Sequence, residues 1–223
     1  MKKYIVILAA ALAVFSSCNK KYEAVGDQSK DNAYARAYMM YIVDNLATDI
    51  LNLFEDAFQV NADVNHRTTQ FDVSGGDFCT VGTVWTVNSD TNPMKGLKME
   101  CTGENRWTAV YNGNYKFGDS SSFPTNVSMS LERADESAQK GHFNWNIRLT
   151  GERTENKGYT CKFRTDKDVT YGVSSRISNS KGGWDVLTGI YFLDVMKDGK
   201  VVDYWTFEMN GSSAANAIFS RGL

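Results

Sequence analysis

The spacing of hydrophobic residues divides this chain into two parts that meet near residue 68. In the first part, apolar side chains recur every three or four positions, which is the stripe of an amphipathic helix. The stripe consists of Tyr34, Tyr38, Ile42, Leu46, Ile50, Leu53, Phe54 and Ala57. Asp31 precedes it and can accept hydrogen bonds from the exposed amides of a first helical turn. The pattern therefore predicts one long helix from Asp31 to Phe58, with Asp31 as its N-cap.

In the second part the spacing is two, which is the period of a strand with one face on the core and one face in water. Alternating segments cover residues 79–87, 97–101, 127–132, 143–150 and 159–164. The dipeptides Asn112-Gly113 and Asp198-Gly199 favour two-residue hairpin turns, because both positions tolerate positive φ. Roughly nine to eleven closely spaced strands are expected. The chain is therefore predicted to be mainly β, either an antiparallel β-sandwich or a meandering barrel, with one N-terminal amphipathic helix.

The predicted helix has an acidic polar face, since Asp44, Asp49 and Asp56 lie largely off the apolar stripe. A helix that lies on a membrane surface carries Lys and Arg on its polar face instead. We therefore expect the helix to dock on the β domain and cover its core, with membrane or partner binding as the alternative.

The first residues of the chain combine a basic start with a short apolar segment. Lys2 and Lys3 precede an apolar run over residues 4–14, and a Phe-Ser-Ser-Cys sequence then ends at Cys18. The run is too short to span a bilayer, which takes about 20 residues. It fits the apolar region of a signal peptide, which is about 7–15 residues long. Two small residues directly before a cysteine resemble the lipobox of a bacterial lipoprotein precursor.

The lipoprotein resemblance implies a processing route and a location. In that family a signal peptidase cuts before the cysteine, whose sulfur carries a diacylglycerol and whose amine is acylated. Cys18 is then the lipidation site, residues 1–17 form the signal peptide, residues 18–30 a tether, and residues 31–223 a single helix-plus-antiparallel-β domain. Asn19 rather than Asp follows the cysteine, which favours the outer membrane of a Gram-negative cell. The periplasmic and the surface side of that membrane both remain open.

The composition is that of a folded, weakly acidic domain. Hydrophobic residues make up 42% and aromatic residues 13% of the 223 residues, which is enough for a packed core and excludes a disordered chain. Loss of the signal peptide lowers the basic count from 24 to 22 against 26 acidic residues, a net charge of −4. This charge provides no electrostatic attraction to nucleic acid.

Three further cysteines, Cys79, Cys101 and Cys161, occupy apolar positions of their strands. If residues 78–101 form a hairpin centred on Asp90, Cys79 lies directly opposite Cys101. Cβ atoms of directly opposed residues are about 4.5–5.5 Å apart, near the range of a disulfide. The sequence predicts a Cys79–Cys101 disulfide, which an oxidising envelope permits. Free buried thiols are the alternative.

The chain offers few groups for catalysis or metal binding. It has only two histidines, His66 and His142, and no set of His and Cys with zinc-ligand spacing. We therefore predict no catalytic residues, no metal site and no cofactor. One carboxylate pair remains: Asp194 and Asp203 face each other if residues 197–200 form a four-residue turn, and they would then share a proton or bind a cation. A three-residue loop with a Gly bulge would separate them.

Aromatic side chains are another candidate for ligand binding, because exposed aromatic rings stack on sugars. Trp107 and Trp184 lie near predicted loops and are expected to be exposed. Together with Asp194 and Asp203, they make up the predicted ligand-binding residues.

These observations predict a non-enzymatic, lipid-anchored envelope protein with a binding or structural role and a glycan or an envelope protein as its partner. Two alternatives remain: a glycan-acting hydrolase that uses paired carboxylates, and a carrier of an apolar ligand in a β-barrel. Exposed Trp107 and Trp184 would favour the glycan binder. Asp194 and Asp203 together in a cleft would favour the hydrolase, and a hollow apolar interior would favour the carrier.

Overall fold

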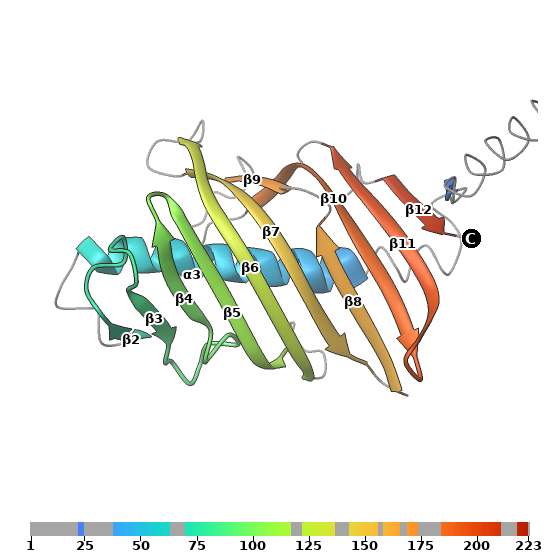
Figure 1. Ribbon diagram of the computed structural model, residues 1–223, viewed down its shortest axis with the longest axis horizontal. Coiled ribbons are helices and arrows are strands. Elements are labelled where there is room, and N and C mark those ends of the chain that lie inside the picture. The colour runs from blue at the N-terminus through green and yellow to red at the C-terminus, as the bar shows by residue number, and fades with distance from the viewer. Residues whose placement is uncertain are drawn as a thin grey trace, which may run out of the picture.

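The computed structural model describes residues 22–24, 38–62, 70–116, 122–136, 143–155, 158–165, 169–173, 184–210 and 218–222. These residues form a helix and one antiparallel sheet of 12 strands (Figure 1). The helix begins as a π-helical segment, η1 (Met39–Asp44), and continues as α3 (Asn45–Ala62). The strands are β1 (Tyr22–Ala24), β2 (Phe71–Ser74), β3 (Val84–Val87), β4 (Lys98–Gly103), β5 (Arg106–Tyr115), β6 (Phe123–Glu136), β7 (Phe143–Thr154), β8 (Tyr159–Thr165), β9 (Val169–Val173), β10 (Trp184–Lys197), β11 (Lys200–Asn210) and β12 (Ile218–Gly222).

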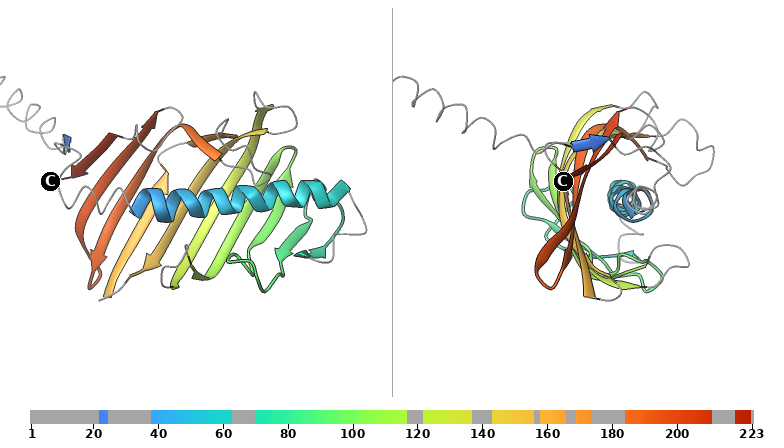
Figure 2. Two further views of the ribbon diagram at one scale, coloured as in Figure 1. Left: turned by 180° about the vertical axis from the view of Figure 1, so that it is seen from behind. Right: turned by 90° about the vertical axis from the view of Figure 1, so that its right-hand side faces the viewer.

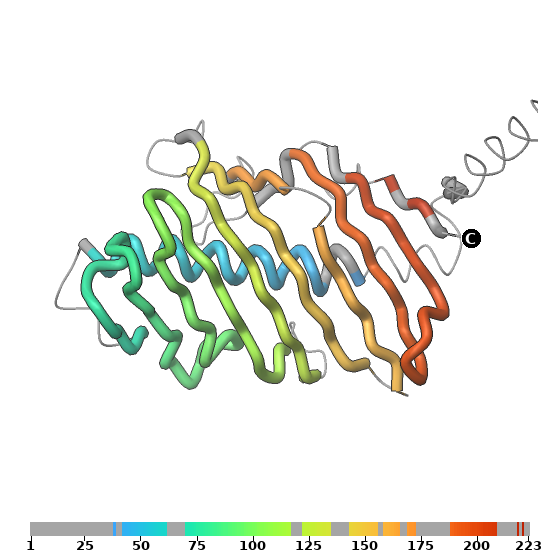
Figure 3. Tube along the Cα trace, viewed as in Figure 1, coloured from blue at the N-terminus to red at the C-terminus, as the bar shows by residue number. Residues whose placement is uncertain are grey.

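Neighbours in the sheet are mostly neighbours in sequence, in the order β1-β12-β11-β10-β8-β7-β6-β5-β4-β3-β2, and the Cα trace follows this meander (Figure 3). β8 and β9 occupy the same position in the sheet, between β7 and β10, because each of them pairs with both of these strands. The prediction of a mainly-β antiparallel fold with one N-terminal helix is confirmed. Of the two predicted arrangements the single meandering sheet is closer to the barrel, and within the described residues no pairing joins its outer strands β1 and β2.

β1 lies inside the segment predicted to be a tether. Tyr22 pairs with Gly222 and Ala24 with Ser220 of β12, in antiparallel register. Part of the predicted tether thus belongs to the sheet, and this part begins four residues after Cys18.

The sheet curves around the helix, which lies along its concave face and crosses the strands (Figure 2). A helix enclosed in this way buries side chains on more than one side, so Val43, Ala47 and Leu51 are buried in addition to the predicted stripe. The expected docking of the helix on the β domain is confirmed. The helix continues to Ala62, and the predicted N-cap Asp31 lies outside the described residues.

An aromatic cluster fills the space between α3 and the sheet. Phe54 is fully buried, and its ring centroid lies 5.4, 6.3 and 5.8 Å from those of Phe78, Trp107 and Trp145. Phe58, about one turn further along the helix, contacts the same three rings at 5.1, 5.3 and 6.0 Å. Edge-to-face aromatic pairs add to the free energy gained from burial, so this cluster is a main attachment of the helix to the sheet.

The predicted hairpin turn at Asn112-Gly113 is wrong, because both residues lie inside β5 and pair with Asn126 and Thr125 of β6. Gly113 is needed here for packing: a Cβ atom would lie 2.6 Å from the Oη atom of Tyr111. Pairing with β6 therefore outweighs the turn preference of the dipeptide. The turn at Asp198-Gly199 is confirmed, with φ values of 50° and 73°.

The structure contradicts the hairpin register on which the predicted Cys79–Cys101 disulfide rests. Trp85 pairs with Met99, so the hairpin is centred on residue 92 rather than on Asp90. Residues 77–82 form turns instead of a strand, with Gly82 at a φ of 83°. Cys79 consequently lies on an exposed turn, and its thiol is free, as are those of Cys101 and Cys161.

Cys79 is expected to be the one thiol of the domain that iodoacetamide modifies in the folded protein. Cys101 is 1% exposed and Cys161 is fully buried, so both should react only after unfolding. Although Cys79 is exposed, partial desolvation of its thiol raises the pKa above the ordinary value. Because the thiolate is the reactive form, alkylation of Cys79 should be slow at neutral pH and should accelerate with pH. Mass spectrometry of a non-reduced digest measures this, and a linked Cys79–Cys101 peptide would contradict it.

Candidate functional site

The convex face of the sheet carries two parallel rows of outward-pointing side chains that cross six strands. The pairing register places one residue of each strand in each row, in the strand order β5-β6-β7-β8-β10-β11. The first row is Asn112, Asn126, Glu152, Lys162, Asp194 and Tyr204. The second row is Val110, Ser128, Thr150, Arg164, Phe192 and Thr206. The residues between the rows point to the concave side, where their side chains are buried: Tyr111, Val127, Phe163, Leu193 and Trp205.

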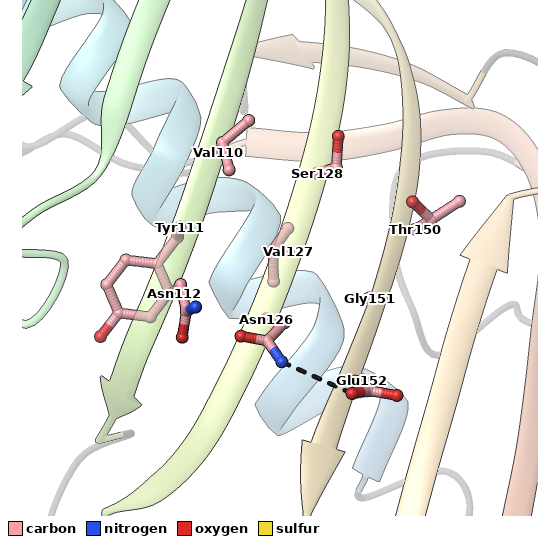
Figure 4. A pocket seen from close by; sticks show the side chains of 9 residues that line it. All are labelled: Val110, Tyr111, Asn112, Asn126, Val127, Ser128, Thr150, Gly151 and Glu152. Carbon is pink, nitrogen blue, oxygen red and sulfur yellow. Dashed lines mark hydrogen bonds between the residues drawn. The ribbon is translucent and has the colours of Figure 1, made fainter.

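An open groove of about 420 Å³ runs between the two rows over β5, β6 and β7 (Figure 4). Its walls are the first three residues of each row, and Tyr111, Val127 and Gly151 line it between them. Only glycine fits at position 151, because a Cβ atom there would lie 2.4 Å from the ring of Phe163 on the concave side. Asn126 Nδ2 donates to Glu152 Oε1 at 3.4 Å across the first row. Amide, hydroxyl and carboxylate groups thus stand along the groove, while most of its lining surface is apolar.

Beyond the groove, the rows continue with charged and aromatic side chains. Lys162 Nζ lies 3.7 Å from Glu152 Oε2, and Arg164 Nη1 donates to Asp194 Oδ2 at 3.0 Å. The Arg164 guanidinium lies 4.8 Å from the centroid of the Phe192 ring. Ion pairs this exposed contribute little to stability, so their hydrogen-bonding groups can be exchanged for those of a ligand at small cost.

The predicted opposition of Asp194 and Asp203 is wrong. The four-residue turn of residues 197–200 does form, but the register then shifts by one residue, so that Asp194 pairs with Tyr204 and Asp203 with Val195. This β-bulge reverses the facing of one carboxylate relative to the other. Asp194 points to the convex face, whereas Asp203, like its pairing partner Val195, points to the concave face. Its Oδ1 atom accepts a hydrogen bond from the Tyr204 amide at 2.9 Å. The two carboxylates cannot share a proton.

The prediction that Trp107 is exposed is also wrong. Its side chain is 2% exposed, and its Nε1–H donates to the carbonyl oxygen of Phe78 at 3.2 Å. Trp107 lies on the concave face of β5, where α3 covers it. Trp184 begins β10 and pairs with Val173 of β9. Its side chain lies outside the described residues, so its exposure stays a prediction.

Two helix carboxylates form partly buried hydrogen bonds with tyrosines of the sheet. Tyr171 Oη donates to Asp44 Oδ1 at 3.0 Å and lies 2.6 Å from the Tyr191 hydroxyl. Tyr115 Oη donates to Asp49 Oδ2 at 2.8 Å. Burial raises the pKa of all three tyrosines, so their hydroxyls stay protonated as donors. These hydrogen bonds hold the helix against the concave face of the sheet.

The hydrophobic pattern did not indicate these contacts, although both aspartates lie off the apolar stripe. Because the sheet curves around the helix, the polar positions of the helix also contact strands. Tyrosines at apolar strand positions next to such acids are the signal that could have revealed them, because buried tyrosine hydroxyls need hydrogen-bond partners.

Arg153 is a buried charge on the concave face of β7, only 1% exposed. Its Nε atom lies 3.1 Å from Glu155 Oε1, and its Nη1 atom donates to the carbonyl oxygen of Tyr115 at 3.3 Å. Cys161 lies nearby, and burial raises the pKa of its thiol to about 12. Cys161 is therefore protonated at neutral pH and unsuited to nucleophilic attack.

The contact between Asp49 and Tyr115 predicts a pH-dependent stability. Burial raises the pKa of the Asp49 carboxyl, and the hydrogen bond from Tyr115 offsets this only in part. A carboxyl with a raised folded-state pKa contributes stability at low pH, which is lost as the pH rises through that pKa. Asp49→Asn should therefore gain stability relative to the wild type between about pH 4 and pH 7. Urea unfolding at both pH values measures the difference, and a difference independent of pH would argue against an ionised, buried Asp49.

Among the described residues, no cluster of His, Cys, Asp and Glu is arranged to hold a metal ion, and His66 and His142 lie outside them. None of the helices in this part of the chain combines the length and the apolar character that crossing a membrane requires. Comparison with protein-family models, curated proteins and solved structures finds no match to this chain.

Proposed function

We propose that this chain is a lipid-anchored envelope protein with a binding role, held on the outer membrane by acyl chains on Cys18. The observation that carries the proposal is the N-terminal sequence, in which a basic start and a short apolar run end in Ser-Ser-Cys. Each acyl CH₂ group buried in the bilayer contributes about 0.8 kcal/mol, and more than one chain gives stable anchoring.

The position of β1 supports a close connection between the anchor and the domain. Tyr22 is the first described residue of the sheet and follows Cys18 by four residues. Four extended residues reach at most about 14 Å. A domain tied to the bilayer by so short a link would be held beside the membrane, with the β1–β12 edge of the sheet nearest to it.

The binding role is supported by the open groove on the convex face, which combines a mostly apolar lining with polar side chains along its walls. The alternative of a glycan-acting hydrolase loses the carboxylate pair on which it rested, because Asp194 and Asp203 lie on opposite faces of the sheet. The alternative of an apolar carrier finds no support in the described residues, where α3 fills the concave side of the sheet. The partners proposed are the membrane, through the lipid, and a glycan or an envelope protein.

Metabolic labelling tests the anchor. Cells that express the full-length chain are grown with an alkyne-bearing fatty acid, and the purified protein is examined for the label. Label on the wild-type protein is expected. A protein that reaches the envelope without any label would contradict the proposal.

A further inference from the structure

We infer that the two outer rows form one extended binding site for a neutral, linear glycan, running from the groove over β5–β7 to the Phe192–Tyr204 ring pair. This inference rests on the binding role proposed above and names the ligand class for it. Nothing in the sequence brings these residues together; the register across six strands does.

The dimensions of the rows suit a single extended chain. Neighbouring strands lie about 4.8 Å apart, so six strands give a track roughly 24 Å long. The rows are two residues apart along each strand, a separation of about 7 Å. A polymer lying across the strands would therefore contact one pair of side chains on every strand that it crosses.

The first row supplies the hydrogen-bonding chemistry that sugar hydroxyls require. A hydroxyl both donates and accepts, so its partners must offer both functions. The amides of Asn112 and Asn126 do so, while Glu152 and Asp194 accept and Lys162 donates. Lys162 is about half exposed, as is Glu152, so these groups are accessible to a ligand.

The far end of the track supplies an aromatic surface. The Phe192 and Tyr204 rings are stacked, with centroids 6.3 Å apart and ring planes 19° apart, and both side chains are partly exposed on the convex face. Arg164 adds donors beside the Phe192 ring. This pair places partly exposed aromatic rings on the convex face, where the sequence led us to expect Trp107.

Charge balance favours a neutral ligand over an acidic or a basic one. The two rows contain two acids, Glu152 and Asp194, and two bases, and each base lies within 3.7 Å of one of the acids. A surface for a polyanion would carry unpaired cations. The track carries no net charge.

Affinity electrophoresis tests the inference with soluble starch, xylan and mannan as neutral probes and polygalacturonate as the acidic probe. The full mature protein is used, extracted from membranes in detergent or recovered from the soluble fraction if it is not lipidated. The assay therefore stays informative if the lipid anchor fails. At least one neutral probe should retard the wild type. Retardation by none of the three, or by polygalacturonate alone, would overturn the inference.

Variants at the two ends of the track test whether one ligand spans it. Asn126→Ala in the groove and Tyr204→Ala at the aromatic end should each weaken binding of the long probe about tenfold, the usual effect of losing one good contact. Ser130→Ala, exposed on the same face of β6 but outside both rows, is the matched control and should bind like the wild type. Asn112→Ala is a second groove variant at an exposed position. Unchanged affinity in both Asn112→Ala and Asn126→Ala would overturn the inference.

Discussion

Replacing Phe54 by alanine is expected to lower the free energy of unfolding by about 3–5 kcal/mol. Phe54 is fully buried and contacts Phe78, Trp107 and Trp145. The variant would leave a cavity in the centre of the aromatic cluster, and the surrounding large rings cannot close it without moving the helix. Because the helix occupies the concave face of the sheet, we expect the whole domain to lose stability rather than the helix alone.

Urea unfolding followed by tryptophan fluorescence measures this effect. Gln59→Ala is the matched control, since Gln59 lies on the same helix but is exposed. The control should change the free energy of unfolding by less than about 0.5 kcal/mol. Equal changes in the free energy of unfolding for the two substitutions would mean that the helix does not pack against the concave face of the sheet as described.

The second large effect is expected for Cys18→Ala, which removes the sulfur that the lipid requires. The variant should lose fatty-acid label completely and leave the membrane fraction, unless the uncleaved signal peptide retains it there. In either case, whether the variant leaves the membrane or is retained there by its signal peptide, the loss of label shows that it is no longer lipidated. Cys79→Ala is the control because Cys79 is exposed and lies within the domain, and this variant should keep the label. Equal labelling of wild type and Cys18→Ala would exclude Cys18 as the attachment site.

Secondary structure was largely predictable because it depends on local periodicity. The strands containing residues 127–132, 143–150 and 159–164 form where the hydrophobic spacing indicated, and so does the described part of the helix, which continues beyond Phe58 to Ala62. Register was less predictable, because a single extra residue changes it. The bulge near Val202 separates Asp194 from Asp203, and turns around Gly82 move Cys79 away from its expected partner.

The candidate site shows the same division between local and non-local information. Alternation correctly predicted that Ser128 and Thr150 point outward, but not that they lie in one row with Arg164 and Phe192. Trp107 was assigned to the surface because it is close to a turn in sequence. Its burial depends on a helix more than forty residues away in sequence, which no local pattern reveals.

The measurement that tests the central claim most directly is the intact mass of the protein extracted from cell membranes. The account predicts a chain of 206 residues that begins at Cys18 and carries the added mass of a diacylglycerol and an acyl group. A membrane-derived protein with an unmodified Cys18, or one that begins at another residue, would contradict the account.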